Sequence, residues 1–330
     1  MTATERMALV REPSSGAAVR ELELTIGPLQ YWWPRTATME LYAAVAESRA
    51  RTVVLGEVVC SRRNEFTLDD WLALARDLVA AGKQVVLATQ VLVMSEGELR
   101  SLRRIAEQDE FAVEAGDASA LHVLARAQGA RPGRKPFVIG PHINIYNRQA
   151  LAEHAALGAG RWVPPLELPL DALALINPPA DPVRGPHGAL ATEVFGFGRM
   201  PLAFSARCFT ARHHRLAKDS CEYRCRDDRD GLLLRSTEGN DFLVLNGIQT
   251  QSAGVHCLID QGDALREAGA RSVRLSPTGG DFARVIELFD RALNRGGARG
   301  AWDELAALDL PGVLVNGYAR RRPGMEVLQP

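Results

Sequence analysis

The chain has 330 residues, of which 46% are hydrophobic and 24% are charged, a composition that excludes a disordered protein and a small disulfide scaffold. Lys and Arg total 39 against 40 Asp and Glu, so the formal net charge is −1 and no broad positive field is available to attract nucleic acid or an anionic membrane. The length permits either two domains or one α/β barrel.

The first residues, 1–21, carry charges of both signs and no continuous apolar run, so they do not match a secretory signal peptide. We interpret them as a frayed leader. No later stretch reaches the roughly 18 uninterrupted apolar residues that a membrane-spanning helix needs, because Lys83 and Gln84 interrupt the most hydrophobic region. The sequence therefore predicts a cytoplasmic protein whose folded part is a single domain, 22–330.

Short β-branched or apolar runs alternate with helical patterns along most of the chain. A helix is expected over 68–81, with Thr67 as its N-cap and Gly82 at its end. Eight repeats of this kind favour a TIM-like (β/α)8 barrel, distorted in places, over an open sheet. The expected strands lie at 22–26, 53–56, 85–88, 111–114, 137–140, 162–163, 192–195 and 272–275.

The alternation stops between Gly198 and Gly269, a span too long for one crossover connection. It holds a polar, cysteine-bearing loop and then the segment LLLRSTEGNDFLVLNG at 232–247. In that segment two strand-like runs flank a cluster of turn-forming residues at 238–241, which predicts a β-hairpin. We expect 199–268 to be an excursion from the barrel after about its seventh strand.

Four of the five cysteines are placed where they can meet at one end of the barrel. Cys60 follows the second expected strand, and Cys208 follows the seventh. Cys221 and Cys225 continue the same long loop. The carboxyl ends of the strands form the usual functional face of such barrels, so the four thiols are the leading candidates for a binding site.

Thiolates are soft, charged ligands, and four of them suit either a tetrahedral zinc ion or an iron-sulfur cluster. The spacing C-x147-C-x12-C-x3-C, with one distant ligand, favours the cluster. The alternative is that Cys60 and Cys208 are ordinary buried thiols, because a free cysteine packs like a small hydrophobic residue. Cys257, in the apolar segment GVHCLID, is interpreted as a core residue.

Several blocks of the sequence resemble the UbiV family of oxygen-independent ubiquinone-biosynthesis proteins, which belongs to the collagenase-like peptidase superfamily. The blocks include LGEVVCSRR at 55–63, EVFGFGRMPLAFSARCFTAR at 193–212, KDSCEYRC at 218–225 and FLVLNGIQT at 242–250. Carried over residue by residue, the resemblance implies that a 4Fe-4S cluster is ligated by Cys60, Cys208, Cys221 and Cys225. It gives Cys257 no such role.

The resemblance also implies a function. It implies the iron-sulfur subunit of an oxygen-independent hydroxylase that acts, in anaerobic growth, on the aromatic ring of ubiquinone precursors, with prephenate as the oxygen donor. The implied partners are a UbiU-like homologue, as a heterodimer, and a UbiT-like lipid-binding protein. Whether this subunit performs the hydroxylation or relays electrons is open. The alternatives are a peptidase or RNA-modifying enzyme of the same superfamily, or a non-catalytic interaction protein with a structural metal cluster.

Polar residues that follow other expected strands are weak catalytic candidates. Glu57, Glu114 and His142 are put forward because such groups gather at the strand ends of barrels and because imidazole moves protons near neutral pH. For any one of them, capping a helix or pairing with an arginine is the commoner role. The residues placed in the same way are Asp117, Asn144, Glu167 and Glu193.

Two further groups of residues lie near the cysteines in sequence. Tyr31, Trp32 and Trp33 follow the first expected strand and suit either a platform for a planar ligand or, as we favour, a core or interface. His213 and His214 lie between cysteines, and we assign them no ligand role. No P-loop and no G-x-G-x-x-G follows the first strand, which excludes the common ATP and NAD sites.

Overall fold

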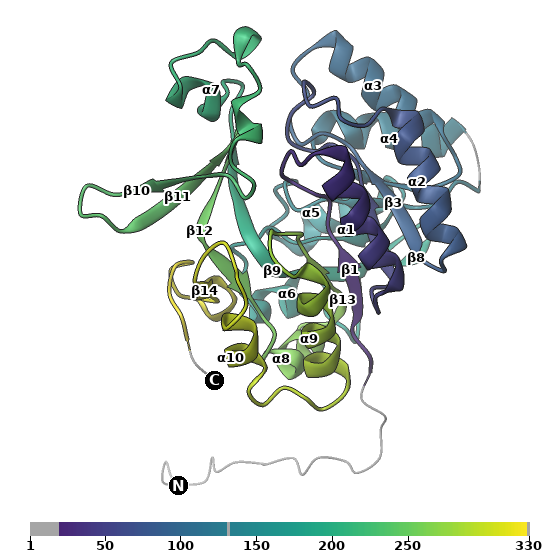
Figure 1. The fold of residues 1–330 in the computed structure, drawn as a ribbon. Coiled ribbons are helices and arrows are strands. Elements are labelled where there is room, and N and C mark those ends of the chain that lie inside the picture. The colour runs from purple at the N-terminus through teal and green to yellow at the C-terminus, as the bar shows by residue number, and fades with distance from the viewer. Residues whose placement is uncertain (1–19, 131–132, 329–330) are drawn as a thin grey trace, which may run out of the picture.

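A computed structural model of the chain describes residues 20–130 and 133–328 (Figure 1). Eight parallel strands pair in a closed ring, because β6 pairs with β9, β9 with β13, and β13 with β1. The structure therefore confirms the predicted TIM-like (β/α)8 barrel. In order around the ring, the strands are β1 (Glu23–Ile26), β2 (Thr52–Leu55), β3 (Gln84–Ala88), β4 (Ala112–Ala115), β5 (Phe137–Ile139), β6 (Ala159–Trp162), β9 (Ala191–Phe204) and β13 (Ala270–Leu275).

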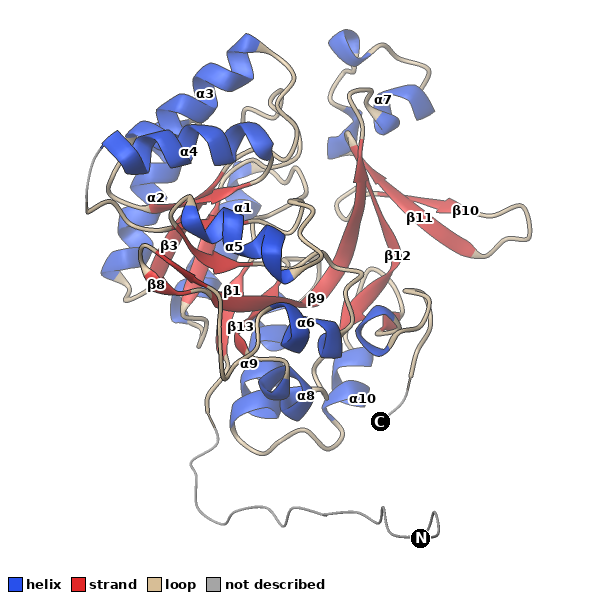
Figure 2. Cartoon of the chain, turned by 180° about the vertical axis from the view of Figure 1, so that it is seen from behind, coloured by secondary structure: helices blue, strands red, loops and turns tan. Residues whose placement is uncertain are grey.

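Helices surround the barrel in both views (Figures 1 and 2). The start of α2 shows how the sequence sets a boundary: the Asp70 N–H donates to the Thr67 hydroxyl at 3.2 Å, and the Thr67 N–H donates to the Asp70 carboxylate at 2.8 Å. The predicted N-cap is confirmed. The helices are α1 (Arg35–Glu47), α2 (Leu68–Ala80), α3 (Glu96–Glu107), α4 (Ala118–Ala130), α5 (Arg148–Ala156), α6 (Leu170–Ile176), α8 (Gly262–Glu267), α9 (Phe282–Asn294) and α10 (Ala301–Ala306).

The barrel strands are buried on both faces, which explains why they are nearly continuous apolar runs in the sequence. In β2, Val53 and Leu55 belong to the large apolar cluster that the helices complete. Val54 belongs instead to a smaller cluster with Val86 and Val138 of other barrel strands. The alternation of the strand side chains thus divides the core into an outer layer and an interior.

The excursion begins within β9 itself. The second half of this 14-residue strand leaves the barrel and pairs antiparallel with β12 (Gln249–Cys257). Beyond β12 lie β11 (Asp241–Asn246) and the edge strand β10 (Leu232–Arg235), which form the predicted hairpin. Figure 2 shows β9 curving out of the barrel towards these strands, with α7 (Phe209–His213) beside their upper end.

Strand β12 is absent from the sequence-based prediction. Its first residues, Gln249 and Gln251, are polar, yet both are buried. Their side-chain amides donate to the side-chain oxygen of Gln30, at 2.8 and 3.0 Å. Because the compensating acceptor lies more than 200 residues away, the local pattern of apolar residues cannot reveal this strand.

Of the leader predicted at 1–21, only Arg20 and Glu21 lie within the described residues. Helix α8 returns the chain to the barrel at the end of the predicted excursion, 199–268. In the parts of the chain that the structure describes, no helix is long and apolar enough to cross a membrane. The remaining short elements are β7 (Arg184–Gly185), β8 (Gly188–Ala189), η1 (Lys218–Ser220), η2 (Arg224–Arg226), β14 (Leu314–Val315) and η3 (Tyr318–Arg320).

Candidate metal centre

The four cysteines that the sequence groups together line one cavity. Cys60 lies in the loop after β2, and Cys208 is the N-cap of α7. Cys221 follows η1, and Cys225 lies within η2. All four are unpaired and partly accessible, whereas Cys257 is fully buried in the core, as interpreted from the sequence.

The turn between Cys221 and Cys225 has an unusual backbone. Glu222 and Tyr223 both adopt left-handed conformations, with φ of 51° and 57°. Two consecutive non-glycine residues in this region store strain, which persists only where the surroundings hold it. The turn allows both flanking thiols to line the same cavity.

Hydrogen bonds within their own loops hold the other two cysteines. The Ala211 N–H donates to the Cys208 Sγ at 3.4 Å, so the thiol caps α7. The Cys60 N–H donates to the Glu57 carboxylate at 3.0 Å, and the Val59 N–H donates to the same oxygen at 2.8 Å. Glu57, a weak catalytic candidate, is thus engaged in shaping the loop that carries Cys60.

A buried arginine forms part of the cavity wall. Arg63 is 4% exposed, and its guanidinium donates to the Gln30 carbonyl at 2.7 Å and to the Asn246 side-chain oxygen at 2.6 Å. It also lies 3.8 Å from the Glu57 carboxylate. Its buried Nε–H finds no acceptor among the described residues. Arg63 is absent from the sequence-based prediction, and its one local signal is its place three residues after Cys60.

Burial raises the pKa of the Cys60, Cys208 and Cys225 thiols, and the Arg63 charge opposes that rise at Cys60 and Cys225. The thiols are therefore protonated at neutral pH when they hold nothing. A metal must displace their protons in order to bind as thiolate complexes. Arg62 and Lys218 also line the cavity and add positive charge around it.

Trp32 closes another side of the cavity. It is 4% exposed, the Arg226 guanidinium lies 3.9 Å from its ring centre, and the Tyr223 ring meets it edge-on at 5.0 Å. Its indole N–H is buried, and nothing in the described part of the chain accepts a hydrogen bond from it. Tyr31 and Trp33 stack on one another within the main core. The aromatic run is thus buried, as favoured, but Trp32 contributes to the cysteine cavity.

The residues around this cavity fit an iron-sulfur cluster. The four cysteines line one cavity, and in a cluster each thiolate binds a different iron. Cluster sulfurs accept hydrogen bonds, and the buried N–H groups of Trp32 and Arg63 are two donors for which the described residues offer no acceptor. Across residues 20–130 and 133–328, no group of three or more His, Cys, Asp or Glu side chains is placed to hold a single metal ion.

Two other acidic candidates, Glu114 and Glu193, form ion pairs in a buried network inside the barrel. Arg274, on β13, donates to Glu114 at 2.9 Å and to Glu193 at 2.6 Å. Arg161 donates to Glu193 at 2.8 Å. Burial alone raises the pKa of Glu193, but the Arg274 and Arg161 charges outweigh it and lower that pKa to about 2. Glu114 and Glu193 are therefore arginine partners within the barrel.

The remaining strand-end candidates also have structural surroundings. His142 packs edge-on against Phe204 at 4.7 Å, and burial, with a contribution from Arg274, lowers its pKa to about 3. The imidazole is therefore neutral at physiological pH. Asp117 caps α4, Glu167 accepts a hydrogen bond from the Tyr146 hydroxyl, and Asn144 is exposed. His213 and His214 stack edge-on and are not among the residues that line the cysteine cavity.

The fold and the site define an α/β-barrel protein with a cysteine-lined cavity beside the ends of its strands. The sequence model of Peptidase family U32 matches residues 37–318, so the chain belongs to that family. Its members are generally enzymes. The superfamily expected from the resemblance is thereby confirmed, whereas the narrower relation to the UbiV family stays a prediction.

Several solved structures are similar at low identity. The U32 peptidase Mk0906 is 14% identical over 81% of this chain and 97% of its own, with a TM-score of 0.42. The spore cortex-lytic enzyme SleL of Bacillus megaterium is 11% identical over 84% of this chain and 76% of its own, with a TM-score of 0.44. A truncated 3-deoxy-D-arabino-heptulosonate 7-phosphate synthase of Thermotoga maritima is 9% identical over 92% of this chain and 93% of its own, with a TM-score of 0.32.

Proposed function

We propose that the chain is the iron-sulfur subunit of an oxygen-independent hydroxylase that acts on the aromatic ring of ubiquinone precursors. The observation that carries the proposal is the single cavity lined by Cys60, Cys208, Cys221 and Cys225. The UbiV-like sequence blocks at 193–212 and 218–225 contain three of these cysteines and supply the substrate class.

The chain's residues would divide the work of holding a 4Fe-4S cluster. The four thiolates would bind iron, and the buried Arg63 would offset their negative charge. Trp32 would donate its indole N–H to the cluster and, with Tyr223 and Arg226 packed against it, exclude water. When bound, the cluster supplies one-electron chemistry at a potential that charge and hydrogen bonds set.

The proposed assembly contains a UbiU-like homologue as heterodimer partner and a UbiT-like lipid-binding protein that presents the quinone precursor, with prephenate as the oxygen donor. A stable heterodimer interface buries well over about 1,000 Å². Co-expression with the homologue is expected to yield a 1:1 complex on size exclusion. Two separately purified, fully iron-loaded monomers that do not associate when mixed would contradict the partnership.

The first experiment measures the cofactor. Protein purified without oxygen is expected to be brown and to contain about four irons and four sulfides per chain. Stoichiometric zinc without acid-labile sulfide, after expression with ample iron, would overturn the cluster assignment.

The second experiment measures the activity in cells. A deletion strain is expected to make ubiquinone with oxygen and to lose it without oxygen, with the wild-type gene on a plasmid as control. Normal anaerobic ubiquinone in the deletion strain would contradict the function. Peptide hydrolysis by the purified, iron-free chain would instead support the peptidase activity for which the family is named.

A further inference from the structure

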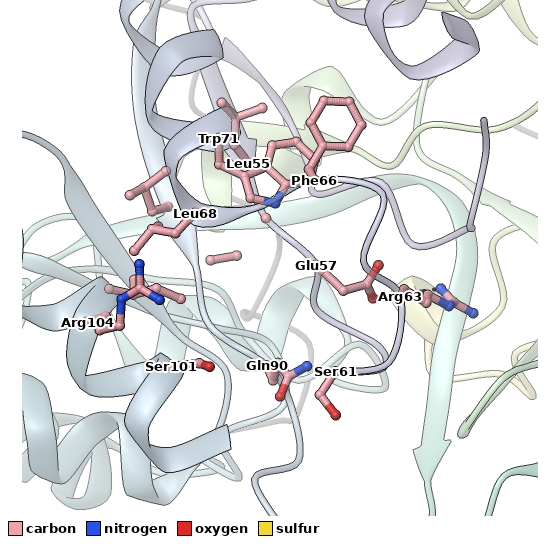
Figure 3. Close-up of a pocket in the computed structure, with 14 residues that line it drawn as sticks. Leu55, Glu57, Ser61, Arg63, Phe66, Leu68, Trp71, Gln90, Ser101 and Arg104 are labelled. Atoms are coloured by element: carbon pink, nitrogen blue, oxygen red, sulfur yellow. Dashed lines mark ion pairs between the residues drawn. The ribbon is translucent and has the colours of Figure 1, made fainter. Parts of the chain in front are cut away.

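A second cavity, of about 190 Å³, lies next to the cysteine cavity, at the ends of β2 and β3 and beside α2 and α3 (Figure 3). The loop that carries Cys60 separates the two. Glu57 and Ser61 of this loop line the second cavity, Cys60 lines the first, and Arg63 lines both. A molecule in the second cavity would therefore sit one loop away from the four thiols.

The size of the second cavity limits what it can hold. Pockets for drug-sized ligands measure roughly 300–1,000 Å³. A dry cavity of roughly 150 Å³ holds one benzene molecule. At about 190 Å³, the second cavity has room for one six-membered ring with a small substituent.

One wall of the cavity is aromatic. Phe66 and Trp71 stack with their ring centres 4.5 Å apart and their planes 24° apart, and Figure 3 shows them on the same side of the cavity. Leu87 and Ile105 add apolar surface from β3 and α3. A flat, apolar ring packs against such a wall better than a polar or branched group does.

The charges of the cavity are asymmetric. Glu57 and Arg63 are engaged by their own loop and by the barrel. Arg104 lies at the opposite end from Glu57 in Figure 3, and within the described ranges its guanidinium has no hydrogen-bond or ion-pair partner. Because it is the end away from the Glu57 carboxylate, this end favours an anionic group on the ligand.

We propose that the second cavity binds a small aromatic carboxylate, with its ring against Phe66 and Trp71 and its carboxylate at Arg104. The proposal rests on the proposed function for the role of this ligand, a small substrate held beside the cluster. The binding itself needs only the cavity, so it is testable without a cluster.

The test is a ligand-observed NMR titration of the full-length protein, purified without oxygen, with benzoate, benzyl alcohol and benzylamine as anionic, neutral and cationic probes of similar shape. Benzoate is expected to bind about 2- to 5-fold more tightly than benzyl alcohol, the range of one solvent-exposed ion pair, and benzylamine more weakly than either. Non-saturable benzoate binding, or equal binding of all three, would overturn the proposal.

Three variants locate the binding. Arg104→Gln is expected to remove the preference for benzoate, while Arg103→Gln, exposed on the same helix and outside the cavity lining, leaves it intact. Ser101→Trp, at an exposed lining position, fills the cavity and is expected to abolish binding of all three probes. Equal effects of the two arginine variants, or undiminished binding to the tryptophan variant with an unchanged melting temperature, would refute the site.

Iron analysis of the same samples separates this proposal from the proposed function. Benzoate binding that depends on Arg104 in a protein unable to hold iron supports the cavity and contradicts the cluster. Full iron loading with no benzoate binding supports the cluster and contradicts the cavity.

Discussion

The barrel interior and the cysteine cavity each contain a buried arginine, but the two arginines are matched differently. Arg274 faces the carboxylates of Glu114 and Glu193, and its hydrogen bonds to them close an ion network. Arg63 donates to two neutral oxygens, lies 3.8 Å from the Glu57 carboxylate, and has one N–H without an acceptor among the described residues. A closed network holds the fold together, whereas an incompletely matched buried charge is available to a ligand.

The backbone conformations of the barrel and of the cysteine cavity also differ. Three of the four described non-glycine residues with positive φ lie between 215 and 223, close to Cys221. The barrel strands contain none of the four. Strain is thus concentrated where the thiols gather, as it is at many functional sites.

The largest expected effect separates the cysteines of the cavity from the one in the core. Cys60→Ala, Cys208→Ala, Cys221→Ala and Cys225→Ala are each expected to lose most of the iron, because one iron is left without its thiolate. Cys257→Ala, with a cost of about 1 kcal/mol of packing, is expected to keep it. Iron and sulfide content after anaerobic purification, with complementation, is the measurement. Iron loss in Cys257→Ala with retention in Cys60→Ala would reverse the assignment.

Opening the closed network is expected to have the largest effect on stability. Arg274→Met leaves the Glu114 carboxylate buried without its arginine and Glu193 with Arg161 alone, and is expected to lower the free energy of unfolding by about 3–5 kcal/mol in urea titrations. Arg271→Met on the same strand breaks an exposed pair with Glu23 and is expected to cost about 1 kcal/mol or less. Equal losses in the two variants would show that the interior network is not the stabilising element.

Acid is expected to weaken the same network. The pKa of Glu193 is lowered from 4.5 to about 2 in the folded protein, so its ionised form stabilises the fold above about pH 4.5. This contribution is lost as the pH falls towards about 2. Urea titrations between pH 5 and pH 2 are expected to show a shallower decline for Glu193→Gln than for the wild type. Parallel declines in the free energy of unfolding for the two proteins would show that Glu193 does not cause the loss of stability in acid.

Substitution of Arg63 is expected to have a smaller effect, which is measured both in the stability and in the iron content. Arg63→Gln loses charged hydrogen bonds to Gln30 and Asn246 and is expected to cost about 2–3 kcal/mol of stability and to reduce iron loading. Arg76→Gln, whose exposed partner is Glu110 and which does not line the cysteine cavity, serves as the control and is expected to change both by little. Normal iron content in Arg63→Gln, despite lower stability, would make Arg63 a purely structural residue.

The smallest effect tests whether the helical layer is independent of the cysteines. Thr67→Ala removes the cap of α2 and is expected to cost about 1 kcal/mol, while Thr67→Ser keeps the hydroxyl and most of the stability. Neither variant is expected to change iron content. Thermal melts measure the stability and iron assays measure the loading of each variant. Iron loss in Thr67→Ala would show that the helical layer affects the cysteine cavity.

The barrel and the grouping of the cysteines can be predicted from local patterns, because β-branched runs and the residues at strand ends are visible in the sequence. The partners that a side chain contacts far along the chain are not visible there. Glu114 resembles a catalytic group until Arg274, 160 residues later, is seen to occupy it. Arg63 resembles any surface arginine until its burial is known. Strand β12 is hidden for the same reason, since its glutamines depend on Gln30.

Strand β9 joins the barrel to the strands outside it, with one end in the wall of the barrel and the other leading to Cys208. Cys60 is carried by a different strand of the same wall. The relative placement of these two thiols is therefore set by barrel closure. In a zinc finger the metal drives folding, whereas these two thiols are brought near one another by the folded barrel itself. A chain whose barrel is misassembled would thus be unable to bind a cofactor at these cysteines.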